Sequence, residues 1–432
     1  MPGRNLICLQ CRQSAFLTMN HNARLIKTGV VAAEVGVFTR LNPIGTRETG
    51  ATGMSILRLV ACLVVGLVSV QELVVKPTVV NLPAGSTGGE IQMALDRLPK
   101  TGGEVVLAEG VFEVAHPIVL QRDSETLRGA GVATILRLAD GANCPVIIMG
   151  EPFNHPRHMV RHLRVAELSI DGNRLHQQQE RWKCSGDGSQ IRNNGITVQT
   201  MGDSTVEQVT SSRCRSGGLV TSHVVRRLTV RDFAAFDNQF DGLACYQTEE
   251  SLFTQLDLHD NPGAGISLDL AFNHNVVSNA VLTANNLGIF MRASSNNQFL
   301  NVTIRNSRQY GVFMAQAEAQ TALGWGPAPG TECVDNLFNN LIATNCGGAA
   351  FHVNNADCTN NVISFAHFEE KCHGNLSLGC RNESSPGEPA FHRPSLCLAR
   401  NALVAVRTSK RYPQLFSKSA HPQLDARSQT TA

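Results

Sequence analysis

The chain lacks any strong excess of charge. Its 37 Lys and Arg residues nearly balance its 35 Asp and Glu residues, which gives a formal net charge of +2. Only 17% of the residues are charged. A domain that binds nucleic acid usually carries a basic patch or stripe. We therefore expect no nucleic-acid partner.

Aromatic residues and long apolar runs are also scarce. Phe, Trp and Tyr make up 5% of the 432 residues, and only two residues are Trp. The interior is therefore expected to contain Val, Ile, Leu, Asn and Gly rather than large rings. The apolar run at 59–70 is about a dozen residues long, which is too short to cross a membrane. We expect no stable membrane span.

The first 71 residues divide at a second methionine. Residues 1–53 show neither strand alternation nor sustained helical periodicity, whereas Met54 is followed by Arg58 and then by the apolar run. A basic residue before such a run is typical of a signal peptide. We interpret residues 1–53 as a mis-predicted upstream extension and residues 54–71 as a segment that directs export. An unusual leader before a buried segment is the alternative.

Paired zinc-type cysteines are missing from the exported part. Of the ten Cys residues beyond the signal-like segment, none forms a C-x-x-C pair, so no metal site is predicted. Cys245 alternates with inward residues and is interpreted as a small buried hydrophobe. In an oxidising compartment the cysteines of the later turns are disulfide candidates with open connectivity. They are Cys333, Cys346, Cys358, Cys372 and Cys380.

What the chain does contain is a short phrase that returns at a fixed interval. Each phrase is a glycine followed by alternating apolar residues, as in Gly265-Ile266-Ser267-Leu268, and alternation is the period of a strand. The successive glycines are separated by 23, 24, 23, 23 and 23 residues. They are Gly195, Gly218, Gly242, Gly265, Gly288 and Gly311. A fixed period of this size indicates a solenoid.

Repeats of this length cannot close a core alone, but stacked in register they form continuous apolar columns. The sequence therefore predicts an all-β chain, a right-handed parallel β-helix of about 23-residue rungs over residues 84–380. Asn238, Asn261, Asn285 and Asn306 precede the glycines and are interpreted as turn residues that bond their own backbone or adopt left-handed conformations.

Both ends of the solenoid have distinct patterns. The segment from Gly89 to Leu98 places Ile91 and Leu95 on one helical face, which predicts a short N-terminal capping helix over the open strands. Residues 381–432 are expected to be irregular, with a closing strand near 396–406 and a disordered tail from about residue 413. We expect a single β-helix domain that is monomeric.

Two insertions interrupt the repeat. The first spans residues 174–194, and the second lengthens the interval from Gly311 to Gly348 to 37 residues. They contain Trp182 and Trp325, which we interpret as stacking platforms for sugar rings, because binding groups concentrate in loops that leave a regular scaffold. Loops packed on their own apolar residues are the alternative. Because the second insertion follows a strand directly, residues 315–334 are expected to overhang the outward side chains of that strand.

Candidate functional residues lie at the outward positions of the repeated strand. Counterparts on adjacent rungs lie about 4.8 Å apart, so Tyr246, Asp269 and Arg292 are expected to be neighbours. The predicted row is Gln199, Ser222, Tyr246, Asp269, Arg292, Ala315 and, two rungs beyond Arg292, His352. Gln199 is interpreted as substrate-binding. Asp171, Asp237 and Asp241 lie in or near turns and are interpreted as turn formers.

These residue types suit chemistry on a uronate sugar. Arg292 can neutralise a sugar carboxylate through a bidentate contact, and Tyr246 or His352 can act as base or acid. Asp269 can orient Arg292 or help to hold a cation, so Ca²⁺ remains open as a cofactor although none is required. The alternative is that Asp269 and Arg292 form an exposed ion pair worth ~0–1 kcal/mol.

The glycine phrases resemble the rungs of pectate-lyase-like proteins, and the stretch Gly102–Val114 resembles the N-terminal part of those proteins and of phage tailspikes. The resemblance implies a right-handed parallel β-helix that is active on polysaccharides, and Tyr, Asp, Arg and His on the groove are the residues that polysaccharide lyases and epimerases use. Several signatures are absent: Asp-Pro-His-Glu of mannuronan C5-epimerases, the paired aspartates and Gly-His-Gly of polygalacturonases, and Trp-Ile-Asp-His of pectate lyases.

Three functions are therefore left open. The first is an exported lyase or epimerase that acts on an acidic, uronate-containing polysaccharide. The second is a glycoside hydrolase, which needs two carboxyl groups, whereas the outward row offers only Asp269. The third is a β-helix without catalytic activity that binds glycans or builds a surface structure.

Overall fold

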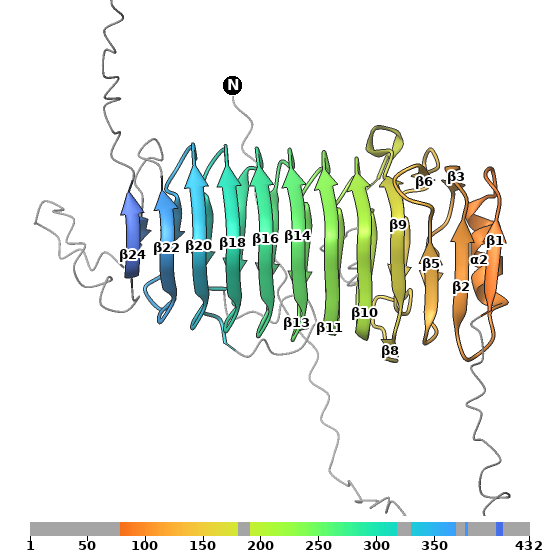
Figure 1. The fold of residues 1–432 in the computed structure, drawn as a ribbon, viewed down its shortest axis with the longest axis horizontal. Helices are drawn as coiled ribbons and strands as arrows, with labels where there is room; N and C mark the ends of the chain where they lie inside the picture. Colours follow the sequence, from red (N-terminus) through yellow and green to blue (C-terminus); the bar gives the residue numbers. More distant parts are fainter. Residues whose placement is uncertain (1–77, 180–190, 318–329, 369–375, 379–402, 409–432) are drawn as a thin grey trace, which may run out of the picture. The chain divides into compact units, whose positions relative to one another are not determined.

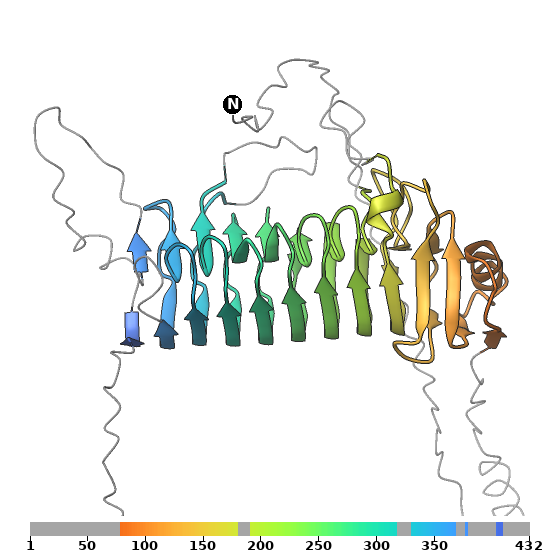
Figure 2. The same ribbon diagram turned by 90° about the horizontal axis from the view of Figure 1, so that it is seen from above.

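The described part of the chain is a coil of parallel strands that form three sheets. The computed structural model describes residues 78–179, 191–317, 330–368, 376–378 and 403–408. Most turns contribute one short strand to the first sheet and one long, bent strand to the other two, and strands of successive turns pair in parallel register. Figure 1 shows the long strands from β9 to β24 side by side in sequence order, and Figure 2 separates them from the short strands.

The first sheet, called the groove sheet below, contains the repeated glycine phrases. Its strands are mostly short, and their register links Leu243, Ile266 and Ile289 in one inward column. The strands are β4 (Ile118–Leu120), β7 (Ile147–Met149), the starts of β10 (Ile196–Ser212) and β11 (Leu219–Phe236), β12 (Leu243–Tyr246), β15 (Ala264–Asp269), β17 (Leu287–Arg292), β19 (Val312–Ala315), β21 (Phe351–Val353) and β23 (Leu376–Leu378).

The second and third sheets share most of their strands. A residue with positive φ, such as Gln255 (φ 55°) or Asn279 (φ 52°), bends each long strand so that its two halves enter different sheets. The strands are β1 (Val79–Leu82), β2 (Gly103–Leu107) and β5 (Glu125–Arg128) in the second sheet, β3 (Gly110–Val114) and β6 (Thr134–Leu138) in the third, and in both β9 (Arg164–Asp171), β10, β11, β14 (Leu252–His259), β16 (Val276–Thr283), β18 (Gln298–Arg305), β20 (Leu337–Thr344), β22 (Val362–Phe368) and β24 (Leu403–Thr408).

Short elements complete the turns. The strands β8 (Val160–Arg161) and β13 (Thr248–Glu249) pair with β10 and β11, and the 3-10 helix η1 (Arg174–His176) follows β9. The predicted capping helix is confirmed as α2 (Gly88–Asp96), with Ile91 and Leu95 fully buried. The Thr87 hydroxyl accepts from the Glu90 N–H, and the Glu90 carboxylate accepts from the Thr87 N–H, which forms a capping box.

The ladders extend beyond the expected limits of the solenoid. β1 pairs with β2, so the first rung begins before residue 84, and β24 pairs with β22, so pairing continues beyond residue 380. The sequence understates both limits because β1 precedes the first glycine phrase and residues 379–402 separate β24 from β23. The closing strand expected near residues 396–406 corresponds to β24, whereas the tail expected from residue 413 and the segments at 1–53 and 54–71 lie outside the described residues.

The core contains more large rings than the composition suggested. Phe299 and Phe338 occupy register positions on β18 and β20, and their rings stack 4.5 Å apart. The buried phenylalanines are Phe112, Phe233, Phe253, Phe272, Phe299, Phe338, Phe351 and Phe368. The expectation of a core without large rings was therefore wrong, because the solenoid brings scattered phenylalanines into one interior and lets them stack between turns.

Asparagines hold the corners of the coil from inside. The Asn275 N–H donates to Oδ1 of Asn297 at 3.0 Å, and the Asn297 N–H donates to Oδ1 of Asn336 at 3.0 Å. This inner asparagine ladder comprises Asn275, Asn297, Asn336 and Asn361, and a second one comprises Asn238, Asn261 and Asn285. These side chains bind neighbouring turns rather than their own, so the prediction that Asn238, Asn261 and Asn285 are self-bonding turn residues was wrong.

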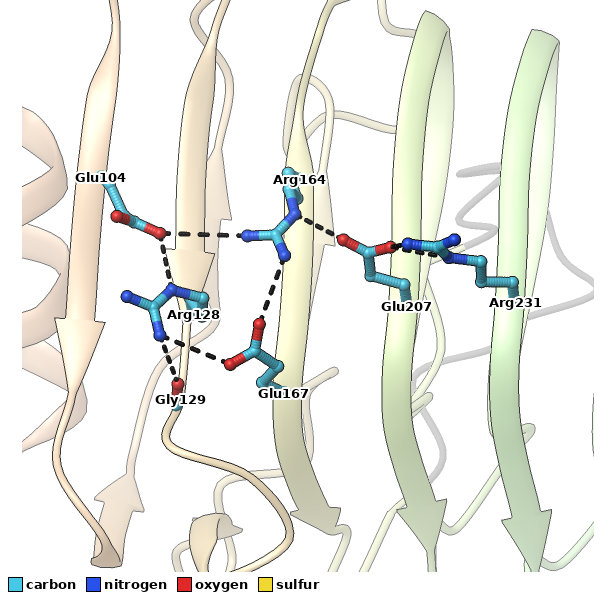
Figure 3. A network of polar contacts seen from close by, with 7 residues as sticks. All are labelled: Glu104, Arg128, Gly129, Arg164, Glu167, Glu207 and Arg231. Atoms are coloured by element: carbon cyan, nitrogen blue, oxygen red, sulfur yellow. Dashed lines mark hydrogen bonds and ion pairs between the residues drawn. The ribbon is translucent and has the colours of Figure 1, made fainter. Parts of the chain in front are cut away.

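Charged residues link the N-terminal turns from outside. Glu207 is 7% exposed and accepts hydrogen bonds from Nε of Arg164 at 2.6 Å and Nε of Arg231 at 2.8 Å. Figure 3 shows how this contact continues across β2, β5, β9, β10 and β11. This charged network comprises Glu104, Arg128, Arg164, Glu167, Glu207 and Arg231.

Candidate functional site

Tyr246, Asp269 and Arg292 lie in one row on the outer side of the groove sheet, as the strand alternation predicts. Tyr246 is the register partner of Asp269, and Arg292 is the register partner of Ala315. The inward neighbours Cys245, Leu268 and Met291 are 0% exposed. Because these inward residues anchor each strand in the core, the row is built on rigid elements.

Asp269 holds one edge of Arg292. Nε of Arg292 donates to both carboxylate oxygens of Asp269 at 3.0 Å, and its Nη2 also contacts Oδ2. Asp269 is 5% exposed, whereas the Arg292 side chain is 42% exposed. Burial raises the pKa of Asp269, although Arg292 opposes the rise. This contact fits both the expectation that Asp269 orients Arg292 and the alternative of a simple ion pair, and the guanidinium reaches the outer surface of the groove sheet.

The neutral phenol is strongly favoured at Tyr246. Burial raises the pKa of Tyr246, and the charges of Asp241 and Asp269 raise it further, while Arg192 and Arg292 oppose the rise. A phenol with a raised pKa is protonated at neutral pH. Tyr246 therefore keeps its proton until it meets a strong base, such as the alkoxide or carbanion that develops during a reaction.

Asp241 is a functional candidate that the sequence did not predict. It immediately precedes the glycine phrase of β12, and its Oδ1 accepts a hydrogen bond from the Ala264 N–H at 2.6 Å. Burial raises the pKa of Asp241 to about 6, although that hydrogen bond and the charge of Arg192 oppose the rise. The bond to Ala264 joins Asp241 to the next turn rather than to its own, and a carboxyl group with this pKa is suited to proton transfer near neutral pH.

Arg192 adds a second cation to this cluster. Its charge lowers the pKa values of both Asp241 and Tyr246, and its guanidinium carbon lies 5.7 Å from the centre of the Phe240 ring. The residue belongs to the insertion at 174–194, whose polar composition was the signal that could have identified it. The acidic centre, as we call it below, comprises Arg192, Asp241, Tyr246, Asp269 and Arg292.

His352 does not belong to the predicted row. Its register partner is Phe313, not Ala315, and its ring stacks on Phe313 at 5.3 Å and on Tyr310 at 4.6 Å. Counting from Gly348 placed His352 level with Arg292, but the Val312 N–H donates to the Ala350 oxygen, so Ala350 is the true counterpart of Gly311. His352 thus lies one outward column away, and burial lowers its pKa.

Gln199 lies at the N-terminal end of the row but is fully buried. It pairs in register with Ser222, and its Nε2 donates to the Phe153 oxygen at 2.9 Å and to the Glu151 oxygen. The amide nitrogen is thus already hydrogen-bonded to the loop that contains Glu151 and Phe153. A substrate-binding role for Gln199 would require that loop to move, because its exposed fraction is 0%.

The two tryptophans lie outside the described residues, in segments 180–190 and 318–329. The described ends of the second insertion are joined by a hydrogen bond, in which the Ala317 N–H donates to the Thr331 oxygen at 2.7 Å. Nε2 of Gln316 also donates to Oγ1 of Thr331 at 3.1 Å. The insertion therefore starts beside the groove sheet, while its expected overhang stays a prediction.

Metal and membrane features are absent from the described part of the chain. Within it, no three His, Cys, Asp or Glu side chains are grouped so that they could hold a metal ion. The same residues include no helix that is long and apolar enough to cross a membrane. Ca²⁺ as an optional cofactor stays a prediction.

A protein-family model described as "Right handed beta helix region" matches residues 165–324. The chain is a right-handed parallel β-helix. Its parallel ladders extend this architecture over the described residues on both sides of the match. No curated protein matches the sequence of this β-helix.

Solved structures are similar to the β-helix at the level of the fold. A Geobacillus virus E2 protein, ORF18, has 13% identity and a TM-score of 0.48, with coverage of 77% of this chain and 63% of the viral protein. The A-module of mannuronan C-5 epimerase AlgE6 from Azotobacter vinelandii has 13% identity, a TM-score of 0.45 and coverage of 75% and 96%. An exopolygalacturonase from Thermotoga maritima has 12% identity, a TM-score of 0.46 and coverage of 70% and 90%.

Proposed function

We propose that this β-helix is an exported enzyme that removes the C5 proton of a uronate residue in an acidic polysaccharide, as a lyase or an epimerase. The observation that carries the proposal is that one cluster contains two proton-transfer groups with different pKa values. Burial raises the pKa of Asp241 to about 6 and also raises the pKa of Tyr246. Groups with separated pKa values are suited to act as base and acid in one reaction.

Arginine would neutralise the sugar carboxylate in this reaction. Asp269 orients one edge of Arg292, while the side chain is 42% exposed and can meet a ligand. Arg192 contributes a second positive charge near Asp241. Neutralising the carboxylate makes the C5 proton more acidic and stabilises the negative charge that develops in the transition state.

Asp241 would accept the proton from C5, and Tyr246 would supply one. Near neutral pH most Asp241 carboxyls are ionised, because their pKa is about 6. In a lyase, Tyr246 would protonate the leaving O4 as the C4–C5 double bond forms. In an epimerase, it would protonate C5 from the opposite face, and no bond of the chain would break.

A glycoside hydrolase is the second candidate, because the acidic centre contains two carboxyl groups on adjacent turns. Burial raises the pKa values of both Asp241 and Asp269. The two bonds from Nε of Arg292 oppose the rise at Asp269, so its carboxylate form is the better stabilised of the two. Asp269 would then serve as nucleophile or base and Asp241 as acid.

The test is a substrate screen in D₂O with polymannuronate, polygalacturonate and polyglucuronate. Epimerisation places deuterium at C5 of intact polymer, a lyase produces unsaturated chain ends, and a hydrolase produces reducing ends with neither signal. Ligand binding without any of the three signals supports a binding protein and contradicts the enzyme proposal. N-terminal sequencing of the native secreted protein tests export separately.

Variants assign the roles on whichever substrate reacts. Asp241→Asn is expected to lower kcat by about 10²–10⁴ through loss of the base, and Arg292→Ala by about 10²–10³ through loss of charge stabilisation. Arg292→Lys should restore activity only in part, because a point charge cannot replace a bidentate fork. Asp237→Asn is the matched control, since Asp237 lies in the same turn but pairs with Arg174. Full activity of both Asp241→Asn and Tyr246→Phe would contradict the assigned centre.

A further inference from the structure

Two cysteines occupy equivalent places in successive turns. Asn336 and Asn361 are neighbours in the inner asparagine ladder, and each is preceded three residues earlier by a cysteine, Cys333 or Cys358. Both cysteines are 0% exposed. Their shared position makes them a stacked pair between the turn of β20 and the turn of β22.

The two side chains are in direct contact. The Cys333 N–H donates to Sγ of Cys358 at 3.5 Å, and the two thiols form a hydrogen bond with each other. That bond lowers the pKa of Cys358, whereas burial raises the pKa of Cys333. Cys358 is therefore the thiol that ionises more readily, and the thiolate is the nucleophile in disulfide exchange.

We propose that Cys333 and Cys358 form a disulfide bond between successive turns when the protein folds in an oxidising thiol–disulfide environment. Each cysteine precedes by four residues one member of the register pair Leu337 and Val362. The Cα atoms of the two cysteines are therefore expected near the inter-strand spacing of about 4.8 Å, within the separation of about 4.4–6.8 Å that disulfides span. In the structure both residues are thiols that no disulfide joins, so the bond is a proposal about the oxidised protein.

The reaction needs a disulfide such as oxidised glutathione as the oxidant. The Cys358 thiolate attacks one glutathione sulfur, which releases the first glutathione thiolate and forms a mixed disulfide. The Cys333 thiolate then attacks the Cys358 sulfur and releases the second. Two protein thiols are oxidised, one glutathione disulfide is reduced to two thiols, and the two protons pass to solvent and the leaving thiolates.

The disulfide would fix the C-terminal end of the second insertion to the next turn. Cys333 lies at the C-terminal end of that insertion, and its Sγ lies 3.4 Å from the oxygen of Ala315, the register partner of Arg292. A disulfide would join this point to the next turn and restrict movement beside the groove sheet. The inference rests on the cysteine geometry alone and stands whether or not the groove is catalytic.

Peptide mapping of the full chain tests the bond directly. The protein is refolded in a glutathione redox buffer, alkylated without reduction, and digested with trypsin and a protease that cleaves before aspartate. Cleavage before Asp335 and Asp357, with tryptic cleavage after Arg308 and Lys371, separates three cysteines into peptides 309–334, 335–356 and 357–371. We expect 309–334 and 357–371 linked, with two hydrogens fewer than the separate peptides. Recovery of both as alkylated thiols, or linkage of either to another cysteine, would overturn the proposal.

Thermal unfolding measures what the bond contributes. Reductant is expected to lower the Tm of the oxidised wild type by about 5–10 °C. Cys333→Ser and Cys358→Ser should each abolish this sensitivity to reductant. Cys346→Ser is the matched control, because Cys346 is also buried but contacts the Thr344 oxygen. The Tm of this variant should still fall when reductant is added. An equal response in all four proteins would contradict the assignment.

Discussion

The outer face of the second sheet is charged in its N-terminal turns and neutral in its C-terminal turns. Glu207 and Arg231 on β10 and β11 are followed in the same register column by Thr254, Ser278 and Leu300. Beyond Asp260, the ion pair found among the described residues is Asp269–Arg292, on the groove sheet. The C-terminal turns instead contain the inner asparagine ladder.

The two regions keep their turns in register by different means. The arginines of the charged network are 29–51% exposed, so water and salt weaken their contacts. The asparagines of the inner ladder are 1–2% exposed, and each satisfies a backbone N–H that has no access to water. A buried donor without a partner costs more than an exposed ion pair contributes. The inner ladder should therefore contribute more to stability per residue than the charged network.

The largest expected effect is at Asn297 in the middle of the inner ladder. Asn297→Ala would leave the Asn275 N–H and the Phe272 oxygen without their bonds, at a cost of about 3–5 kcal/mol in unfolding free energy. Denaturant unfolding measures this loss. The control is Asn301→Gly, because Asn301 is exposed at φ 57° and bonds Asn279 at the surface. A loss at Asn297 no larger than that of the control would remove the distinction between the two regions.

A smaller effect is expected at Glu207, the most buried member of the charged network. Glu207→Gln removes the charge that holds Arg164 and Arg231, at a cost of about 1–2 kcal/mol, because both arginines can then turn to solvent. Glu113→Gln, at an exposed position of β3, is the control and should change little. If Glu207→Gln lowers the unfolding free energy as much as Asn297→Ala does, charged contacts rather than buried amides keep the turns in register.

The smallest effect is the response of the N-terminal turns to salt and acid. Burial alone would raise the pKa of Glu207, but the bonds from Arg164 and Arg231 outweigh it and lower the pKa. A lowered folded-state pKa contributes stability above the ordinary pKa, and this contribution is lost as pH falls through the folded value. Hydrogen exchange should show β9 to β11 losing protection by about 0.5 kcal/mol in about 1 M salt, and losing it progressively as pH falls below the ordinary glutamate value of about 4.3, while β16 to β20 change less. Equal losses in both regions would contradict this.

The sequence predicted the coil because glycine spacing and strand alternation are local signals. It did not identify the inner ladder, because an asparagine at a corner can bond its own turn or the next one. In the structure, Asp237 and Asp260 adopt positive φ while Asn238 and Asn261 turn inward. A single sequence contains no signal that decides between adjacent residues.

The candidate site was predictable in part for the same reason. Tyr246, Asp269 and Arg292 follow from the alternation, since they lie within regular 23-residue intervals. His352 was misplaced because the long insertion shifts the register by two residues. Asp241 was missed because its raised pKa depends on its surroundings in the folded chain, which no local pattern reveals.

The proposed chemistry depends on the claim that burial raises the pKa of Asp241. It can be measured by ¹³C NMR titration of the aspartate carboxyl groups, with the Asp241 signal assigned by its loss in Asp241→Asn. The predicted result is a carboxyl that titrates at about 6, well above the ordinary value for aspartate. A titration of Asp241 near 4 would contradict it, because the group would then be a turn former without the basicity that proton removal from C5 requires.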